Sequence, residues 1–176
     1  QLVVFAEYDK GTQQASGNCA IQISQTAAKP GETVTVYISV ENNPGIQGAI
    51  LTVTWDEGLT LTKKAQNGVA FSALGLTAPK KLASPYNLVW YAQDLDPEDI
   101  KDGVIATLEF EVSQQAKIGQ KLAISASYIA GDISDRNKQT LSPTIESGFV
   151  AVEGAEHTHN FNKAVAIEKH LANAAT

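Results

Sequence analysis

Apolar and polar residues alternate along most of the chain, from Cys19 to Glu153. The alternation is clearest in four runs, at residues 34–41, 50–55, 106–112 and 122–128. A β-strand turns successive side chains to opposite faces, so a period of two indicates strands with one face in a core. The pattern therefore predicts that these four runs are β-strands.

Turn-forming residues separate the predicted strands. Pro-Gly pairs stand at residues 30–31 and 44–45, and Asn-Gly and Asp-Gly pairs stand at residues 67–68 and 102–103. These residue types fix or permit the backbone angles of tight turns. Several short strands at this spacing predict an all-β fold in which two sheets pack as a sandwich.

The two ends of the chain differ from the body. Residues 1–18 combine an apolar stretch over 2–5, which predicts an extra edge strand, with a polar connector. Over residues 160–174 apolar residues recur at helical spacing: Phe161, Val165, Ile167 and Leu171. This tail either forms a short helix of the domain or is a linker helix without a role in it. We expect one sandwich domain over residues 19–153, an N-terminal extension over 1–18 and a C-terminal tail over 154–176.

Charge and hydropathy exclude several partners. Thirteen basic and nineteen acidic residues give a formal net charge of -6, and no run of Lys or Arg is longer than two residues. A polyanion would be repelled, so we expect no nucleic acid partner. No apolar run reaches the length of about 18 residues that spans a bilayer, so we expect no membrane insertion. Cys19 is the only cysteine, and its place in an alternating run predicts a buried structural thiol.

Candidate catalytic groups are scarce in the body of the chain. All three histidines, His157, His159 and His170, follow Glu153, so a Ser-His-Asp or Cys-His mechanism is not expected. The acidic residues concentrate in turns and on outward strand positions, where solvation explains them better than a paired-carboxylate glycosidase site. We therefore predict that the protein is not an enzyme and has no catalytic residues.

One acidic segment resembles the start of a calcium-binding loop. Asp94, Asp96 and Glu98 occupy the first, third and fifth positions of an EF-hand pattern. The match fails at the sixth position, where Asp99 replaces the required glycine, and at the twelfth, where Ile105 replaces glutamate. We predict no dedicated metal site and no cofactor, with weak calcium binding by the body as an open alternative.

Four segments in order resemble the strands of a cohesin domain of cellulosomal scaffoldins: residues 28–56, 89–94, 102–110 and 130–152. The first contains Lys-Pro-Gly-Glu-Thr-Val, and the second is Val-Trp-Tyr-Ala-Gln-Asp. The resemblance covers about residues 19–153. It implies a jelly roll of about nine strands that binds a dockerin, a small calcium-loaded helical module, on one flat sheet face.

The resemblance also implies a biological setting. Cohesins are non-catalytic docking modules that assemble cellulosomes, the complexes that degrade plant cell walls. We therefore expect a secreted protein, extracellular or attached to the cell surface through a larger scaffold, whose calcium requirement resides in the dockerin.

The family analogy implies eight partner-binding residues: Gly48, Ile50, Thr52, Leu88, Trp90, Ala92, Gln93 and Asp94. Polar Asn and Asp would be expected at the positions of Gly48 and Ile50 in the best-known cohesin type, so its specificity does not transfer. A physical argument leads to the same face. If Leu51, Val89 and Tyr91 point inward, Ile50 and Trp90 point outward and expose two large apolar groups. Alternatively, residues 68–86 or the tail cover them.

The sequence also allows two other functions. Carbohydrate-binding modules also use jelly-roll sandwiches with exposed aromatic rings, although this chain has only two tryptophans, of which Trp55 is predicted to point inward. A structural adhesin or spacer domain would need no binding face, and substitution of Ile50 or Trp90 would then change no interaction.

Overall fold

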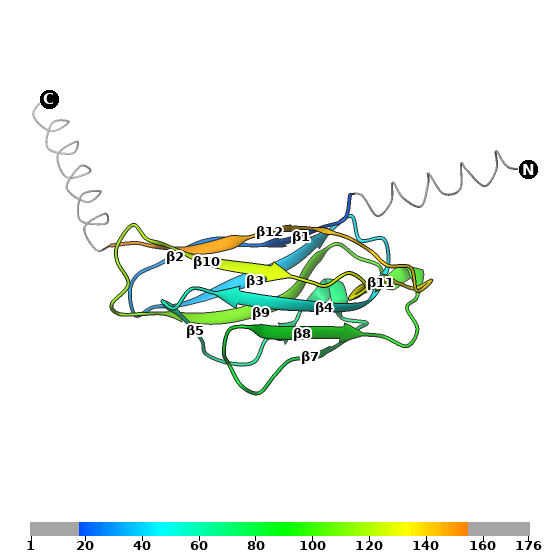
Figure 1. The fold of residues 1–176 in the computed structure, drawn as a ribbon, viewed down its shortest axis with the longest axis horizontal. Coiled ribbons are helices and arrows are strands. Elements are labelled where there is room, and N and C mark those ends of the chain that lie inside the picture. Colours follow the sequence, from blue (N-terminus) through cyan, green and yellow to red (C-terminus); the bar gives the residue numbers. More distant parts are fainter. Residues whose placement is uncertain (1–17, 155–176) are drawn as a thin grey trace, which may run out of the picture.

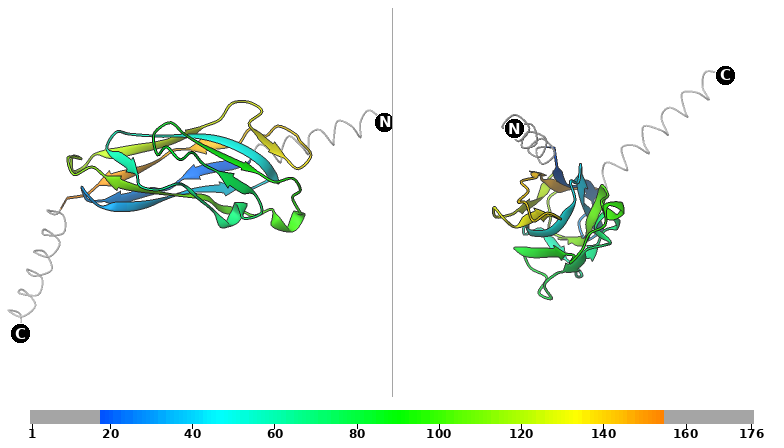
Figure 2. Two further views of the ribbon diagram at one scale, coloured as in Figure 1. Left: turned by 90° about the horizontal axis from the view of Figure 1, so that it is seen from below. Right: turned by 90° about the vertical axis from the view of Figure 1, so that its right-hand side faces the viewer.

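The computed structural model describes residues 18–154, which fold into two β-sheets packed face to face (Figure 1, Figure 2). This confirms the all-β sandwich that the alternation predicted. The strand predicted over 2–5, the three histidines and the helix predicted over 160–174 lie outside the described residues. No helix within residues 18–154 is long and apolar enough to cross a membrane.

The smaller sheet has six strands in the order β12-β1-β3-β9-β5, with β6 also paired to β9. Their bounds are β1 Ala20–Ile23, β3 Thr33–Glu41, β5 Leu59–Leu61, β6 Gln66–Asn67, β9 Gly103–Val112 and β12 Thr144–Glu146. The long antiparallel pair β3 and β9 forms its centre and runs from Thr33 opposite Glu111 to Val40 opposite Gly103. Its inward residues, such as Ile38 and Leu108, are completely buried.

The larger sheet has seven strands in the order β2-β13-β10-β4-β8-β7, with β11 also paired to β4. Their bounds are β2 Gln25–Ala28, β4 Ile46–Trp55, β7 Gly75–Thr77, β8 Tyr86–Tyr91, β10 Lys121–Ser127, β11 Ile133–Asp135 and β13 Gly148–Val152. Figure 1 shows β10, β4, β8 and β7 side by side. Two short 3₁₀ helices complete the fold, η1 at Val69–Phe71 and η2 at Pro97–Asp99.

Two chain segments cross from one sheet to the other next to each other. Ser24 separates β1 from β2, and Ser147 separates β12 from β13. The two segments run parallel, because β12 pairs with β1 in one sheet and β13 pairs with β2 in the other. These crossings divide two continuous segments into four strands. They are one reason why the fold has thirteen strand segments where about nine were expected.

At this crossing Gly148 leaves no room for a side chain. A Cβ atom there would overlap the carbonyl oxygen of Ser24, which is backbone and cannot rotate away. We expect Gly148→Ala to lower the free energy of unfolding by about 1–3 kcal/mol, the usual cost of overpacking, measured by urea denaturation. Gly75→Ala is the matched control, because its Cβ would meet only the carbonyl oxygen of Tyr91, at 3.7 Å. Equal losses in the two variants would contradict this prediction.

The interior between the sheets is apolar and continuous. Trp55 points inward as predicted, with its ring packed edge-on against Phe110 at a centroid distance of 5.1 Å. Cys19 is 1% exposed, which confirms the buried thiol. Burial, with a smaller contribution from the negative charge of Asp102, raises the pKa of the Cys19 thiol to about 11. The thiol therefore stays protonated at neutral pH, and its role is packing.

Candidate docking face

The outer surface of the larger sheet presents a set of small, polar and apolar residues that we call the open face. Its members are Gly48, Ile50 and Thr52 of β4; Asn87, Val89 and Tyr91 of β8; Gly75 and Thr77 of β7; Ser127 of β10; and Ser134 of β11. Their register brings them together across neighbouring strands: Gly48 lies opposite Tyr91, and Ile50 lies opposite Val89. Thr52 donates its hydroxyl to Asn87 Oδ1 at 2.9 Å, which fixes two of these side chains.

Charged residues are almost absent from the strands that build this face. Lys121 and Asp135, each at the end of a strand, are the only charged residues in the described strands of the larger sheet. The smaller sheet differs, because Glu41, Glu109 and Glu111 lie on its two central strands. Solvation favours charged residues at exposed positions, so it does not explain a nearly uncharged sheet surface in a chain of net charge -6.

Three large apolar side chains are exposed on or beside the open face. Tyr91 is 63% exposed and Ile50 is 37% exposed. Ile129, which is 76% exposed, begins a turn whose Asp132 carbonyl accepts a hydrogen bond from the backbone N–H of Ile50. Exposed apolar groups on a strand surface with few charged residues are typical of a surface that binds a protein.

Tyr91 stands between two glycines. Gly48 of β4 and Gly75 of β7 both lie directly opposite it, one on each side. A Cβ atom on Gly48 would come within 4 Å of only Ser134 Oγ and the Trp90 carbonyl oxygen, and one on Gly75 would meet only the Tyr91 carbonyl oxygen. The Tyr91 ring therefore does not lie over either glycine. The arrangement makes a ridge between two shallow gaps, a shape into which the side chains of a helix can pack.

The structure corrects the predicted orientation of β8. Leu88, Trp90 and Ala92 point into the core, with exposed fractions of 0%, 1% and 7%, and do not lie on the open face. Trp90 packs edge-on against Phe71 at 5.5 Å, and its indole N–H donates to Asn67 Oδ1 at 3.0 Å. A hydrogen-bonded partner for the indole inside the sandwich favours this orientation over the predicted one.

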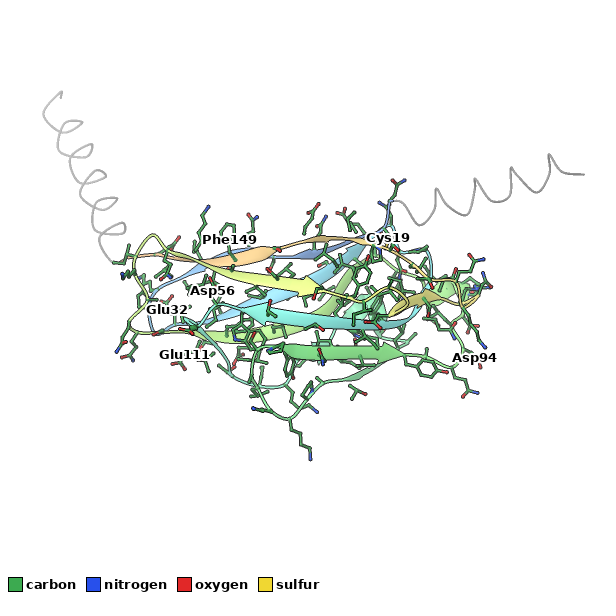
Figure 3. The ribbon with its side chains drawn as sticks, viewed as in Figure 1. Cys19, Glu32, Asp56, Asp94, Glu111 and Phe149 are labelled. Atoms are coloured by element: carbon green, nitrogen blue, oxygen red, sulfur yellow. The ribbon has the colours of Figure 1, made fainter. Side chains whose placement is uncertain are left out.

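The other predicted site residues lie outside the core. Gly48, Ile50 and Thr52 point outward, as predicted. Gln93 and Asp94 are exposed in the loop after β8. Figure 3 shows Asp94 at one end of the molecule. The outward residues of β8 are Asn87, Val89 and Tyr91, which were not predicted. The polar Asn87 is the one signal in the sequence that indicates the outward side of this strand.

The acidic segment after β8 does not gather into a metal site. Asp102 accepts hydrogen bonds from the backbone N–H groups of Asn42 and Asn43 at 3.0 and 2.9 Å, so its carboxylate holds the turn between β3 and β4. Across residues 18–154, no group of three or more His, Cys, Asp or Glu side chains is close enough to hold a metal ion.

Comparison with known protein families identifies the class. The family model described as the cohesin domain matches residues 19–152, nearly all of the described structure. The chain therefore belongs to the cohesin domain family. A search of curated proteins found no match.

Solved structures share the fold at low sequence identity. A cohesin in a type I cohesin–dockerin complex from Clostridium thermocellum is 23% identical with a TM-score of 0.63, covering 77% of this chain and 99% of that chain. A type III cohesin module of a cell-surface anchoring scaffoldin from Ruminococcus flavefaciens is 20% identical with a TM-score of 0.67, covering 78% and 88%. A non-cellulosomal cohesin from Archaeoglobus fulgidus is 16% identical with a TM-score of 0.65, covering 82% and 97%.

Proposed function

We propose that the open face binds a dockerin and that this chain is a non-catalytic docking module. The proposal rests on the nearly uncharged sheet surface, on which Ile50 and Tyr91 are exposed. An interface core excludes charge and uses large apolar or aromatic anchors, which is the composition of this face. Membership of the cohesin family supports the proposal, as do structural neighbours that were solved in complexes with dockerins.

The shape of the face suits a helical partner. The Tyr91 ridge and the gaps over Gly48 and Gly75 let the backbone of a helix approach closely while its side chains pack on both sides of the ring. We further propose that calcium acts through the fold of the dockerin. Removal of calcium would then abolish binding without changing the stability of the cohesin domain.

We also propose that the protein is secreted and works as part of a cellulosome, held outside the cell or on its surface by a larger scaffold. Neighbours from cellulosomal scaffoldins support this setting. A non-cellulosomal cohesin shares the fold, so the fold is not confined to cellulosomal proteins. A panel of dockerins that tests binding should therefore include cellulosomal and non-cellulosomal members.

The arrangement of aromatic rings argues against the carbohydrate-binding alternative. A sugar platform needs several rings in one plane, but Trp90 is buried and Trp55 packs against Phe110. The exposed tyrosines of the described structure, Tyr37 and Tyr91, lie on different sheets. No row of rings therefore forms on either surface of residues 18–154.

Calorimetric titration of the full chain with a panel of dockerins tests the proposal. We expect at least one dockerin to bind with a dissociation constant in the range of about 10⁻⁷ M or tighter in calcium, with no binding in chelator. Tyr91→Ala should weaken this binding by about tenfold or more, because it removes an exposed aromatic anchor. Tyr37→Ala removes the exposed tyrosine of the other sheet and should leave affinity unchanged.

Two results would count against the proposal. Failure of every dockerin to bind, with binding to cellulose or xylan, would favour the carbohydrate-binding alternative. Equal loss of affinity in Tyr91→Ala and Tyr37→Ala would show that the open face is not the binding surface.

A further inference from the structure

A polar hollow of about 920 Å³ continues the open face at one end. Gly48 and Tyr91 belong both to the open face and to the lining of the hollow. The loop after β8 forms one wall of the hollow, and the turn after β11 forms the other. A partner that lies along β4 and β8 over Tyr91 therefore also reaches the hollow.

The two walls carry opposite charges. Asp94 and Asp96 lie on the wall formed by the loop after β8, and Arg136 and Lys138 lie on the opposite wall. All four residues are exposed. The ion pair found within residues 18–154 joins Lys63 to Glu109 in another part of the fold, so none of these four charges is paired in the described structure.

The basic wall is held rigidly by its own turn. Asp135 Oδ1 accepts hydrogen bonds from the backbone N–H groups of Asn137 and Gln139 at 2.8 and 2.9 Å. The backbone N–H of Arg136 donates to the Gly45 carbonyl, and the aliphatic part of the Arg136 side chain lies against Gly45. Asp135 also lines the hollow and keeps its negative charge, so this wall carries one negative and two positive side chains, of which Arg136 and Lys138 are exposed.

The acidic wall is also anchored to the sheet. Gln47 of β4 donates its side-chain amide to the carbonyl oxygens of Ala92 and Gln93 at 3.0 and 2.8 Å. These bonds fix the start of the loop that carries Asp94 and Asp96. Both walls are therefore set before a partner arrives, which lowers the entropic cost of binding.

We infer that the hollow extends the open face and binds two oppositely charged side chains of a docked dockerin. A basic side chain lies beside Asp94 and Asp96, and an acidic side chain lies beside Arg136 and Lys138. This inference rests on the proposed dockerin function and adds the residues that select among dockerins. Because the rest of the face is nearly uncharged, the polarity of this hollow decides which dockerin binds and in which direction it lies.

The test compares association rates of the full chain and four variants with a dockerin that binds the wild type. Arg136→Glu/Lys138→Glu reverses the basic wall, and Asp94→Lys/Asp96→Lys reverses the acidic wall. The quadruple variant combines both pairs and so reverses the polarity of the hollow while the net charge of the chain stays at the wild-type value. Lys29→Glu/Lys117→Glu applies the same change of net charge as the first pair at the other end of the sandwich, near the end of β13.

We expect the quadruple variant to bind at least about tenfold more weakly at low salt, with much of the difference lost at high salt. The variant of Lys29 and Lys117 should differ from wild type by less than about threefold. A quadruple variant with wild-type rates and affinity would overturn the inference while leaving the dockerin function intact. Failure of the wild type to bind any dockerin would overturn both. Circular dichroism of each variant confirms that these exposed substitutions leave the fold intact.

Discussion

Trp90→Ala is expected to lower the free energy of unfolding by about 3–5 kcal/mol, the usual cost of removing a large aromatic side chain from a core. The Trp90 side chain is 1% exposed and packs edge-on against Phe71 between the sheets. Its indole N–H donates to Asn67 Oδ1, an atom that also accepts the backbone N–H of Gly68. The substitution therefore opens a cavity and loosens the segment that leads into η1.

The next residue along β8 provides the matched control. Tyr91 points to the opposite side of the sheet and is 63% exposed, so Tyr91→Ala should change the free energy of unfolding by less than about 1 kcal/mol. Urea denaturation followed by far-ultraviolet circular dichroism measures both variants without depending on tryptophan fluorescence. A larger loss for Tyr91→Ala than for Trp90→Ala would mean that the side chains of β8 face the other way.

The different outcomes for β3 and β8 show what alternation can and cannot determine. In β3, apolar Val36, Ile38 and Val40 alternate with polar or exposed residues, so only one orientation buries the apolar side chains. In β8, residues 88–91 are all apolar, and either orientation buries two of them. The orientation is decided by the partners that Trp90 finds inside the sandwich, Asn67 and Phe71, which lie in a different part of the sequence.

Only the β4 residues of the open face were predicted, because only on β4 does the alternation fix the orientation of the strand. On β4, Leu51 and Val53 alternate with Thr52 and Thr54, so the outward position of Ile50 follows from sequence. The hollow could not be predicted, because its two walls meet only when β11 pairs with the beginning of β4. In the sequence, Asp94 and Arg136 are merely two charged residues in separate polar loops.

Ile50→Asp is expected to weaken dockerin binding by at least about 30-fold, which corresponds to the loss of about 2 kcal/mol or more at a hot spot. Two effects act together, because the substitution removes an apolar anchor and places a carboxylate where docking would desolvate it without a partner. The backbone N–H of residue 50 still bonds to the Asp132 carbonyl, since that contact does not depend on the side chain. The free domain should therefore stay folded, which thermal unfolding checks.

Val69→Asp is the control that matches this change in size and charge. Val69 is 77% exposed in η1, which packs against β9 of the smaller sheet and contributes no residue to the open face. The same carboxylate at this position should leave dockerin affinity within about twofold of wild type. A general effect of added negative charge on the association would lower the affinity of both variants.

We propose that this cohesin binds dockerin through the outer surface of its larger sheet. The most direct measurement is calorimetric titration of wild type, Ile50→Asp and Val69→Asp with one dockerin in calcium. We expect strong binding by wild type and Val69→Asp and a loss of affinity of at least about 30-fold for Ile50→Asp. Equal affinity for Ile50→Asp and wild type would contradict the claim and would place the binding surface elsewhere on the domain.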